Sequence, residues 1–98
     1  MRTGDGEIVK VAVLGRNKVE FCCHALDQMV IRGISKEDVI KTLQHPTKVG
    51  LKVNPPLPFR RHVRRDFNAN KTIDVVYEER LDCIVVVTAF PKLYTGKR

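Results

Sequence analysis

The sequence predicts one α+β domain, with two N-terminal helices packed on one face of a mainly antiparallel sheet of about four to five strands. Two observations predict this class. Residues 24–44 carry apolar side chains at the three-and-four spacing of amphipathic helices, and the chain after Pro46 alternates or repeats apolar residues as strands do. The length of 98 residues allows one domain over residues 1–98, with residues 1–6 and 92–98 as loose ends.

The chain before the helices is expected to contribute the first strand. Apolar residues recur through residues 7–14, and residues 15–17 supply the glycine and asparagine of a turn. Residues 19–21 are either a second short strand or a direct lead into the first helix. The sequence leaves this boundary open.

Two helices follow, and each has a recognisable end. The first covers residues 24–31, and Gly33 favours a left-handed residue just after it. The second begins at Ser35, whose hydroxyl can accept the amide hydrogen of Asp38 as a capping residue does. Pro46 ends the second helix because proline has no amide hydrogen for the helical ladder.

The remaining strands are predicted from period-two patterns. Residues 47–53 alternate apolar and polar side chains, and the proline-rich residues 54–58 interrupt the sheet. Residues 59–67 form a basic strand, and residues 72–77 and 83–90 form a hairpin. The last of these segments is apolar on both faces, which is typical of a central strand. The sheet face away from the helices is then expected to be free to bind a ligand.

The charge balance indicates a polyanionic partner. The chain has 18 Lys and Arg against 11 Asp and Glu, a formal net charge of +7. The basic side chains cluster on the strand over residues 59–67, whose terminal residues Phe59 and Phe67 could stack on bases. A solvated edge strand that resists aggregation is the alternative. The predicted nucleic-acid-binding residues are Arg60, Arg61, Arg64, Arg65 and Lys71.

Several other classes are disfavoured by what the sequence lacks. No apolar run approaches the ~18 residues that span a bilayer, and the first residues lack the apolar region of a signal peptide, so a cytoplasmic protein with no membrane partner is expected. Three cysteines, two of them adjacent at Cys22 and Cys23, favour free thiols over a disulfide framework. Cysteine and histidine do not recur at the spacing of zinc sites, and we expect no metal and no cofactor.

One motif is spread over residues 21–91, and it consists of His24-Ala25, Met29, Arg32-Gly33-Ile34-Ser35, Val39, Leu43, Pro46, Val85-Val86-Val87-Thr88 and Pro91. This pattern resembles a domain-of-unknown-function family that is grouped with the RelE-type toxins. The resemblance implies a compact RelE-like fold and metal-independent ribonuclease chemistry in toxin-antitoxin or related systems, with RNA as substrate and a small acidic antitoxin-like protein as a further partner. The chain departs from the family pattern at Cys22, Gln28 and Ile31.

The resemblance assigns His24 and Arg32 to the family's histidine and arginine. RNA cleavage by 2′-hydroxyl attack needs one group that removes the hydroxyl proton, another that protonates the leaving oxygen, and cations that stabilise the phosphate. We expect His24 to carry one proton, His62 to carry the other and Arg32 to stabilise the phosphate. Tyr77 and Thr88 are expected to help in substrate binding.

Each assignment has an alternative. His24 could instead be a partly buried residue that is hydrogen-bonded to a backbone carbonyl at the start of a helix. Arg32 could interact with the carboxyl-terminal end of the first helix or pair with Asp27 or Glu37. At the level of function, one alternative is a non-catalytic module that binds nucleic acid or an acidic protein. The other is a toxin that acts on a protein target such as a topoisomerase.

Overall fold

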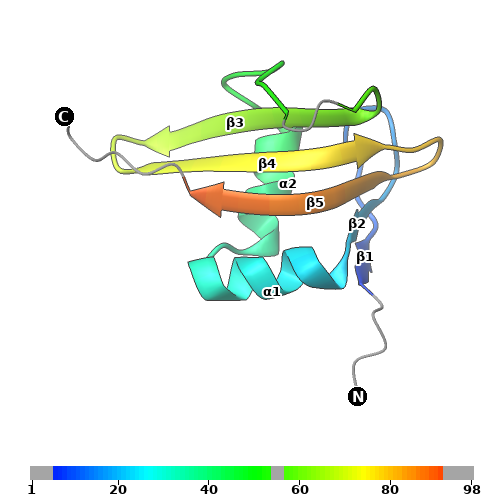
Figure 1. The fold of residues 1–98 in the computed structure, drawn as a ribbon, viewed down its shortest axis with the longest axis horizontal. Coiled ribbons are helices and arrows are strands. Elements are labelled where there is room, and N and C mark those ends of the chain that lie inside the picture. Colours follow the sequence, from blue (N-terminus) through cyan, green and yellow to red (C-terminus); the bar gives the residue numbers. More distant parts are fainter. Residues whose placement is uncertain (1–5, 54–56, 92–98) are drawn as a thin grey trace.

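Two helices and a five-stranded sheet make up the part of the chain that the computed structural model describes, residues 6–53 and 57–91 (Figure 1). The predicted loose ends, apart from Gly6, and most of the predicted proline-rich break lie outside these residues. The elements in chain order are β1 (Glu7–Val9), β2 (Val19–Phe21), α1 (Cys23–Arg32), α2 (Lys36–Gln44), β3 (Arg60–Asn68), β4 (Lys71–Glu79) and β5 (Ile84–Pro91).

The sheet is mixed, and the prediction of a mainly antiparallel sheet is wrong. The strand order is β1-β2-β5-β4-β3. Among the described strands, β2 pairs in parallel with β5, whereas the pairs β1–β2, β3–β4 and β4–β5 are antiparallel. A parallel pair requires a long crossover between its strands. Here the two helices and the β3–β4 hairpin provide it, so that β5 returns beside β2 in the same direction.

The two helices occupy different places, and the prediction that both pack on one face is not confirmed. Figure 1 shows α2 behind the sheet, where it contacts β3 and β4, and α1 below β5, which it contacts. Along one edge of β5, β2 pairs only with Ile84 to Val86. The rest of this edge is contacted by α1. The Cys22 thiol lies 3.9 Å from the Val87 carbonyl, and the Arg32 guanidinium donates to the Ala89 carbonyl. The first helix therefore covers part of a strand edge.

The ends of both helices follow the predicted signals. Gly33 has a left-handed backbone, with φ of 69°, and the amide of Ile34 donates to the Met29 carbonyl at 2.9 Å. The Ser35 hydroxyl accepts the amide hydrogen of Asp38 at 3.1 Å and so caps α2. Local sequence signals were sufficient for both boundaries.

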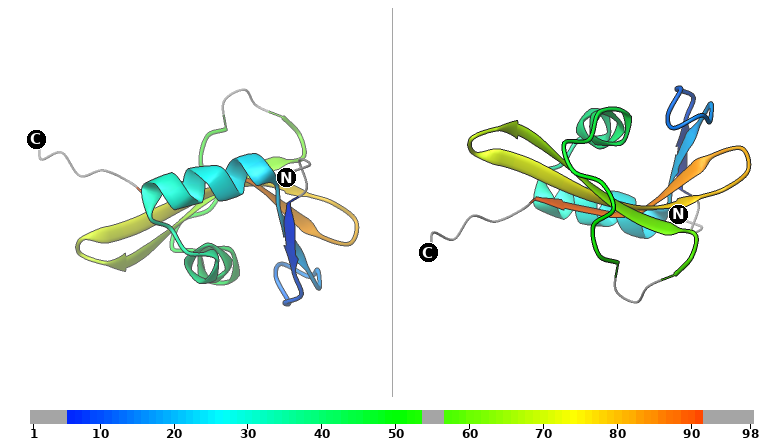
Figure 2. Two further views of the ribbon diagram at one scale, coloured as in Figure 1. Left: turned by 90° about the horizontal axis from the view of Figure 1, so that it is seen from below. Right: turned by 90° about the horizontal axis from the view of Figure 1, so that it is seen from above.

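Two predicted strands are shorter or absent. The strand predicted over residues 7–14 ends at Val9. Beyond it, Val11 donates one backbone hydrogen bond to Asn17 and Val13 pairs with Arg16 at a single bridge, across a turn with positive φ at Leu14 and Gly15. Residues 19–21, left open by the sequence, do form β2. Residues 47–53 are not a strand: they cross the outer edge of β3 and pair with it at one bridge, between Lys48 and Arg64. Figure 2 shows this segment passing from the α2 side of the sheet to the opposite side.

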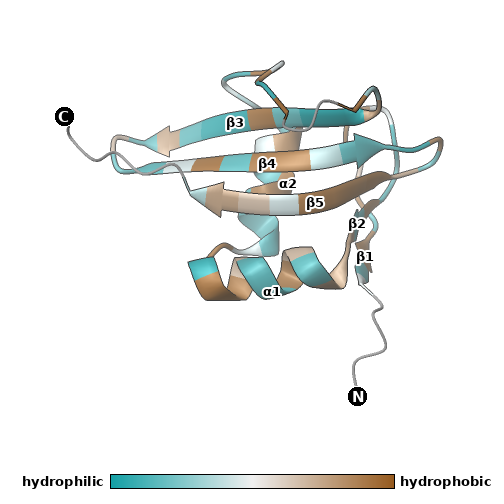
Figure 3. Cartoon of the chain, viewed as in Figure 1, coloured by the Kyte–Doolittle hydropathy of each residue, from teal (hydrophilic) through white to brown (hydrophobic). Residues whose placement is uncertain are grey.

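The core is one cluster of apolar side chains from both helices and from β2 to β5. Val63, Val75 and Val86 are buried on the sheet face that α2 covers, whereas β3 as a whole is hydrophilic (Figure 3). None of the helices in the described residues has the length and apolar character needed to cross a bilayer. The fully buried large apolar side chains are Val13, Val19, Phe21, Val39, Leu43, Val75, Ile84 and Val86.

Candidate nucleic-acid interface

The sheet face opposite α2 carries a dense group of charged and aromatic side chains. Strand register places His62 across from Val76, and Val76 across from Thr88, so alternate residues of three strands share this face. Phe90 lies two residues beyond Thr88 on the same face. We call this surface the His62 face, and its members are Arg60, His62, Arg64, Asp74, Val76, Glu78, Thr88 and Phe90.

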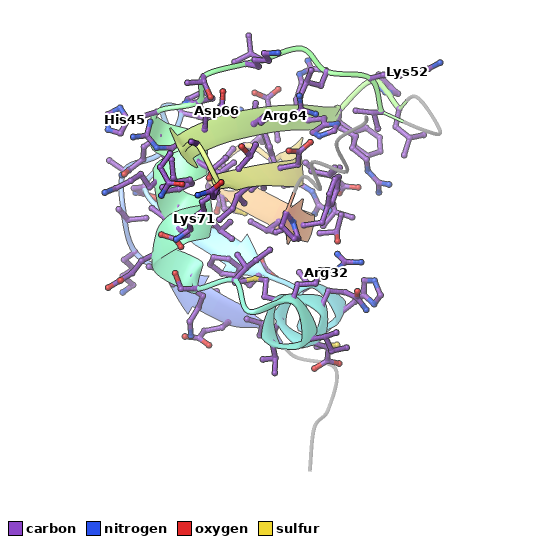
Figure 4. The ribbon with its side chains drawn as sticks, turned by 90° about the vertical axis from the view of Figure 1, so that its left-hand side faces the viewer. Arg32, His45, Lys52, Arg64, Asp66 and Lys71 are labelled. Carbon is purple, nitrogen blue, oxygen red and sulfur yellow. The ribbon has the colours of Figure 1, made fainter. Side chains whose placement is uncertain are left out.

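Two walls border the His62 face. On one side α1 runs along β5, and on the other side the chain that crosses the edge of β3 continues past Lys52 (Figures 2 and 4). Figure 4 shows Arg32 and Lys52 at opposite margins of this side of the sheet, with His45 and Lys71 near α2 on the other side. The face is therefore a trough that is open to solvent.

A pocket of about 280 Å³ lies in this trough. It combines apolar walls, one aromatic ring and several hydrogen-bond donors. The Phe90 ring meets the His62 ring edge to face, with centroids 5.8 Å apart. The pocket is lined by Lys52, Val53, Arg60, His62, Val76, Val87, Thr88 and Phe90.

Asp74 is the buried anion of the His62 face, with a side chain only 2% exposed. Its carboxylate accepts two hydrogen bonds from Arg64, at 2.8 and 3.0 Å, and lies 2.8 Å from the Nε2 atom of His62. Burial raises the pKa of Asp74, but the hydrogen bonds from Arg64 and His62 outweigh burial and leave this pKa below its usual value. The carboxylate therefore stays ionised.

Glu78 forms a second shared anion farther along β4. It accepts hydrogen bonds from Arg80 at 2.8 Å and from Arg60 at 2.5 Å, and these bonds lower the pKa of Glu78 despite its burial. Each of the two carboxylates is thus shared by two basic side chains. Arg60 and Arg64 are therefore paired with carboxylates within the protein, and these four formal charges of the face cancel.

His62 uses both ring nitrogens inside the protein. Nδ1 lies 3.0 Å from the Lys52 carbonyl oxygen, and Nε2 lies 2.8 Å from the Asp74 carboxylate. The His62 ring therefore links the loop at Lys52 to Asp74 on β4.

The two depressed carboxylate pKa values predict a loss of stability in acid. A group whose pKa is lower in the folded state stabilises the fold above its ordinary pKa, about 4 for these carboxyls, and this contribution is lost as the pH falls through the folded value. We expect the free energy of unfolding, measured in urea from pH 7 to pH 2.5, to fall below about pH 4. The Glu78→Gln variant should lose less over the same range. A constant free energy would contradict the prediction.

Arg32 reaches the His62 face from the last turn of α1. Its Nη1 atom donates to the Ala89 carbonyl at 2.9 Å and to the Thr88 hydroxyl at 3.3 Å, and its guanidinium lies 6.0 Å from the centre of the Phe90 ring. The alternative in which Arg32 pairs with Asp27 or Glu37 is not observed. In the part of the chain that the structure describes, no carboxylate neutralises Arg32.

Other predicted binding residues lie away from the His62 face. Arg61 lies 3.5 Å from the Glu79 carboxylate, and the predicted helper Tyr77 is buried in the core, where burial raises its pKa. Strand alternation puts Tyr77 on the opposite side of the sheet from Thr88. Arg65 donates to the His45 carbonyl, and Lys71 pairs with Asp38, while both cations lie about 5 Å from the Phe67 ring. The predicted binding strand is thus divided between two faces.

His24 lies exposed in the first turn of α1. Its side chain makes no hydrogen bond within the described residues, and this differs from the alternative of a buried, hydrogen-bonded histidine. His24, Gln28 and Arg32 are spaced four residues apart, so they follow one side of α1. Along the helix axis His24 and Arg32 are about 12 Å apart at 1.5 Å per residue.

The described part of the chain contains no group of three side chains that could hold a metal ion. Cys22, Cys23 and Cys83 are free thiols, in agreement with the prediction. Burial raises the pKa of the Cys83 thiol, which makes it a structural residue and not a reactive one.

Four members of the His62 face were not predicted, Asp74, Val76, Glu78 and Phe90, and neither was Lys52 of the pocket. A period-two count from Thr88 would have placed Phe90 on the same face, and an acidic residue between apolar neighbours in β4 would have marked Asp74 as the partner of a cation. No sequence signal marked Lys52, because its position depends on how residues 47–53 cross β3.

The comparisons with known proteins give one match. No curated protein and no solved structure matches the chain. A family model described as "Domain of unknown function (DUF4258)" matches residues 21–91, which include both helices, β3, β4 and β5. The matched residues include the three strands that form the His62 face, β3, β4 and β5, and the two segments that flank it, α1 and the chain at Lys52. The chain is therefore a member of the DUF4258 domain family.

Proposed function

We propose that this protein binds single-stranded RNA on the His62 face. The observation that carries the proposal is Arg32, a guanidinium without a carboxylate partner in the described residues that lies beside Thr88 and Phe90 at the margin of the pocket. A cation next to a half-buried ring and an apolar pocket is the arrangement that binds a phosphate and stacks the neighbouring base. The net charge of +7 attracts such a ligand.

A single strand fits this face better than a duplex. The trough is bordered by α1 and by the loop at Lys52, and its pocket is lined by apolar side chains that need a base with a free face. In a duplex the faces of the bases are stacked on their neighbours and are closed to such contacts. Arg32 and Lys52, at opposite margins, could then contact successive phosphates.

Ribonuclease activity is a second candidate, and it is supported by the free imidazole of His24. In this reaction the 2′-oxygen attacks phosphorus, His24 takes the 2′-hydroxyl proton, and the bond to the 5′-oxygen breaks. Arg32 would stabilise the charge on the phosphate. His62 could protonate the leaving oxygen only after releasing its bond to Asp74 or to Lys52. This activity would make the protein a metal-independent RelE-like toxin, with a small acidic antitoxin-like partner.

RNA binding should depend on salt and on Arg32. We expect the affinity for a labelled single-stranded RNA, measured by fluorescence anisotropy, to fall with salt at a log-log slope near −3 for roughly four phosphate contacts. The Arg32→Gln variant should bind about tenfold more weakly, with a slope smaller by about 0.7, because one phosphate contact is lost.

The Lys41→Gln variant is the matched control for this measurement. Lys41 is exposed on α2, on the other side of the sheet, so the variant removes the same charge without changing the His62 face. Equal losses for both variants would show that only net charge matters and would overturn the site. Binding that does not change with salt would exclude RNA and favour a protein partner.

A further inference from the structure

We infer that the bound strand leaves the pocket along the outer edge of β3, and that Lys48 binds the phosphate of a nucleotide beyond the one in the pocket. The inference rests on the proposed RNA binding and adds to it the path of the strand. It follows from how the segment that carries Lys48 pairs with β3, from the side of the sheet on which this pairing places the lysine, and from its charge.

The segment that crosses the outer edge of β3 is held there by backbone hydrogen bonds at two levels. At the first, the Lys48 amide donates to the Arg64 carbonyl at 3.0 Å, and the Arg64 amide donates to the Lys48 carbonyl at 2.9 Å. At the second, the Leu51 amide donates to the His62 carbonyl at 3.2 Å, and the His62 ring bonds to the Lys52 carbonyl. Lys48 is therefore level with Arg64, and Lys52 with His62.

The bridge between Lys48 and Arg64 decides on which side of the sheet the lysine lies. Two residues that exchange both backbone hydrogen bonds in an antiparallel pair send their side chains to the same side of the sheet. Arg64 belongs to the His62 face, where it donates to Asp74. The exposed side chain of Lys48 therefore borders the outer margin of this face.

The charges of Lys48 and Lys52 are available to a ligand. Neither ammonium group forms an ion pair with a carboxylate of the described residues, whereas the neighbouring Arg64 is held by Asp74. An ammonium group without a carboxylate partner binds phosphate as a point charge. At this margin it is the two lysines, and not the arginine of β3, that offer their charge to an RNA backbone.

The positions of the two lysines fit successive nucleotides of one strand. Lys52 lines the pocket beside His62, and Lys48 lies beside Arg64, two residues farther along β3. Two residues of an antiparallel strand cover about 7 Å, which is comparable to the separation of successive phosphates in an extended nucleic acid. A strand with one base in the pocket thus continues past Lys48, so the site takes an oligonucleotide and not a single nucleotide.

The first test compares Lys48→Gln with Lys10→Gln in the binding of a ten-nucleotide single-stranded RNA, by fluorescence anisotropy. We expect Lys48→Gln to bind about fivefold more weakly and to reduce the log-log salt slope by about 0.7, because one phosphate contact is lost. Lys10 is the matched control: it is also exposed, but it follows β1 at the opposite edge of the sheet. Its replacement should leave the slope unchanged.

The second test needs no variant and uses an amine-reactive label, read by mass spectrometry. The bound RNA should reduce the labelling of Lys48 and Lys52 several-fold and leave the labelling of Lys10 as in the free protein. Equal losses for the two variants, or full labelling of Lys48 in the complex, would overturn the path along β3 and leave RNA binding intact. Lys48 would then serve only to keep the sheet edge from pairing with other chains. Failure of the RNA to bind the unaltered protein would reject the proposed function itself.

Discussion

Replacing Asp74 by asparagine is expected to lower the free energy of unfolding by about 3 kcal/mol or more. The carboxylate is 2% exposed, and its partners His62 and Arg64 have side chains that are 13% and 17% exposed. Asparagine would fill the same volume but leave the Arg64 guanidinium without a counter-charge, and the His62 ring without its carboxylate partner, in a largely buried site. Urea unfolding followed by circular dichroism at pH 7 measures the loss.

The control for this variant is Asp82→Asn. Asp82 pairs with Lys18 at 3.5 Å, but its side chain is 73% exposed, so the pair is screened by water and its loss is expected to change the free energy of unfolding very little. Similar losses in both variants would show that burial does not increase the contribution of Asp74. A loss below about 1 kcal/mol for Asp74→Asn would contradict the assignment of Asp74 as the anion on which the His62 face depends.

Replacing His24 by alanine is expected to reduce RNA cleavage at least 100-fold and to leave RNA binding in place, if the protein is a ribonuclease. The physical reason is that alanine cannot take the 2′-hydroxyl proton, whereas Arg32 and Lys52 still bind the strand. Cleavage of a labelled RNA in the presence of EDTA measures the rate. A substrate with a 2′-deoxy group at the cut site should resist, because the attacking oxygen is missing.

His45→Ala is the matched control for the cleavage experiment. His45 is also exposed, but it follows α2 on the other side of the sheet, and its contact to Arg65 is made by its backbone carbonyl. The control should cleave at the full rate. Cleavage that survives His24→Ala would disprove the role of this histidine, and an unaltered protein that binds RNA but never cleaves it would be a binding module.

Local signals in the sequence predicted the helices and most of the β3–β5 region well. Gly33, Ser35 and Pro46 act on the backbone within one turn of their own positions, so the ends of α1 and α2 were predicted within about one residue. The period-two pattern likewise placed Arg60, His62 and Arg64 on one face of a strand. These features depend on neighbouring residues alone.

Contacts between distant residues were predicted less well. The alternation in residues 47–53 favours a strand, but the segment makes only one bridge to β3, because Gly50 adopts a left-handed backbone and the chain crosses the edge of the strand. The arginines of β3 were expected to bind phosphate, yet Arg60 and Arg64 are held by Glu78 and Asp74. Those carboxylates lie on another strand, and their pairing depends on register.

The sequence by itself determined the α+β class, the helix boundaries, the basic strand and the free cysteines, since each follows from the chemistry of residues close together in the chain. The tertiary structure alone decided that β2 and β5 run parallel, that α1 covers an edge of β5, and that Lys52 and Phe90 line one pocket with Arg32 beside the Phe90 ring. The reason is that strand pairing and the burial of charge are settled by residues up to 65 positions apart, as Cys22 and Val87 are.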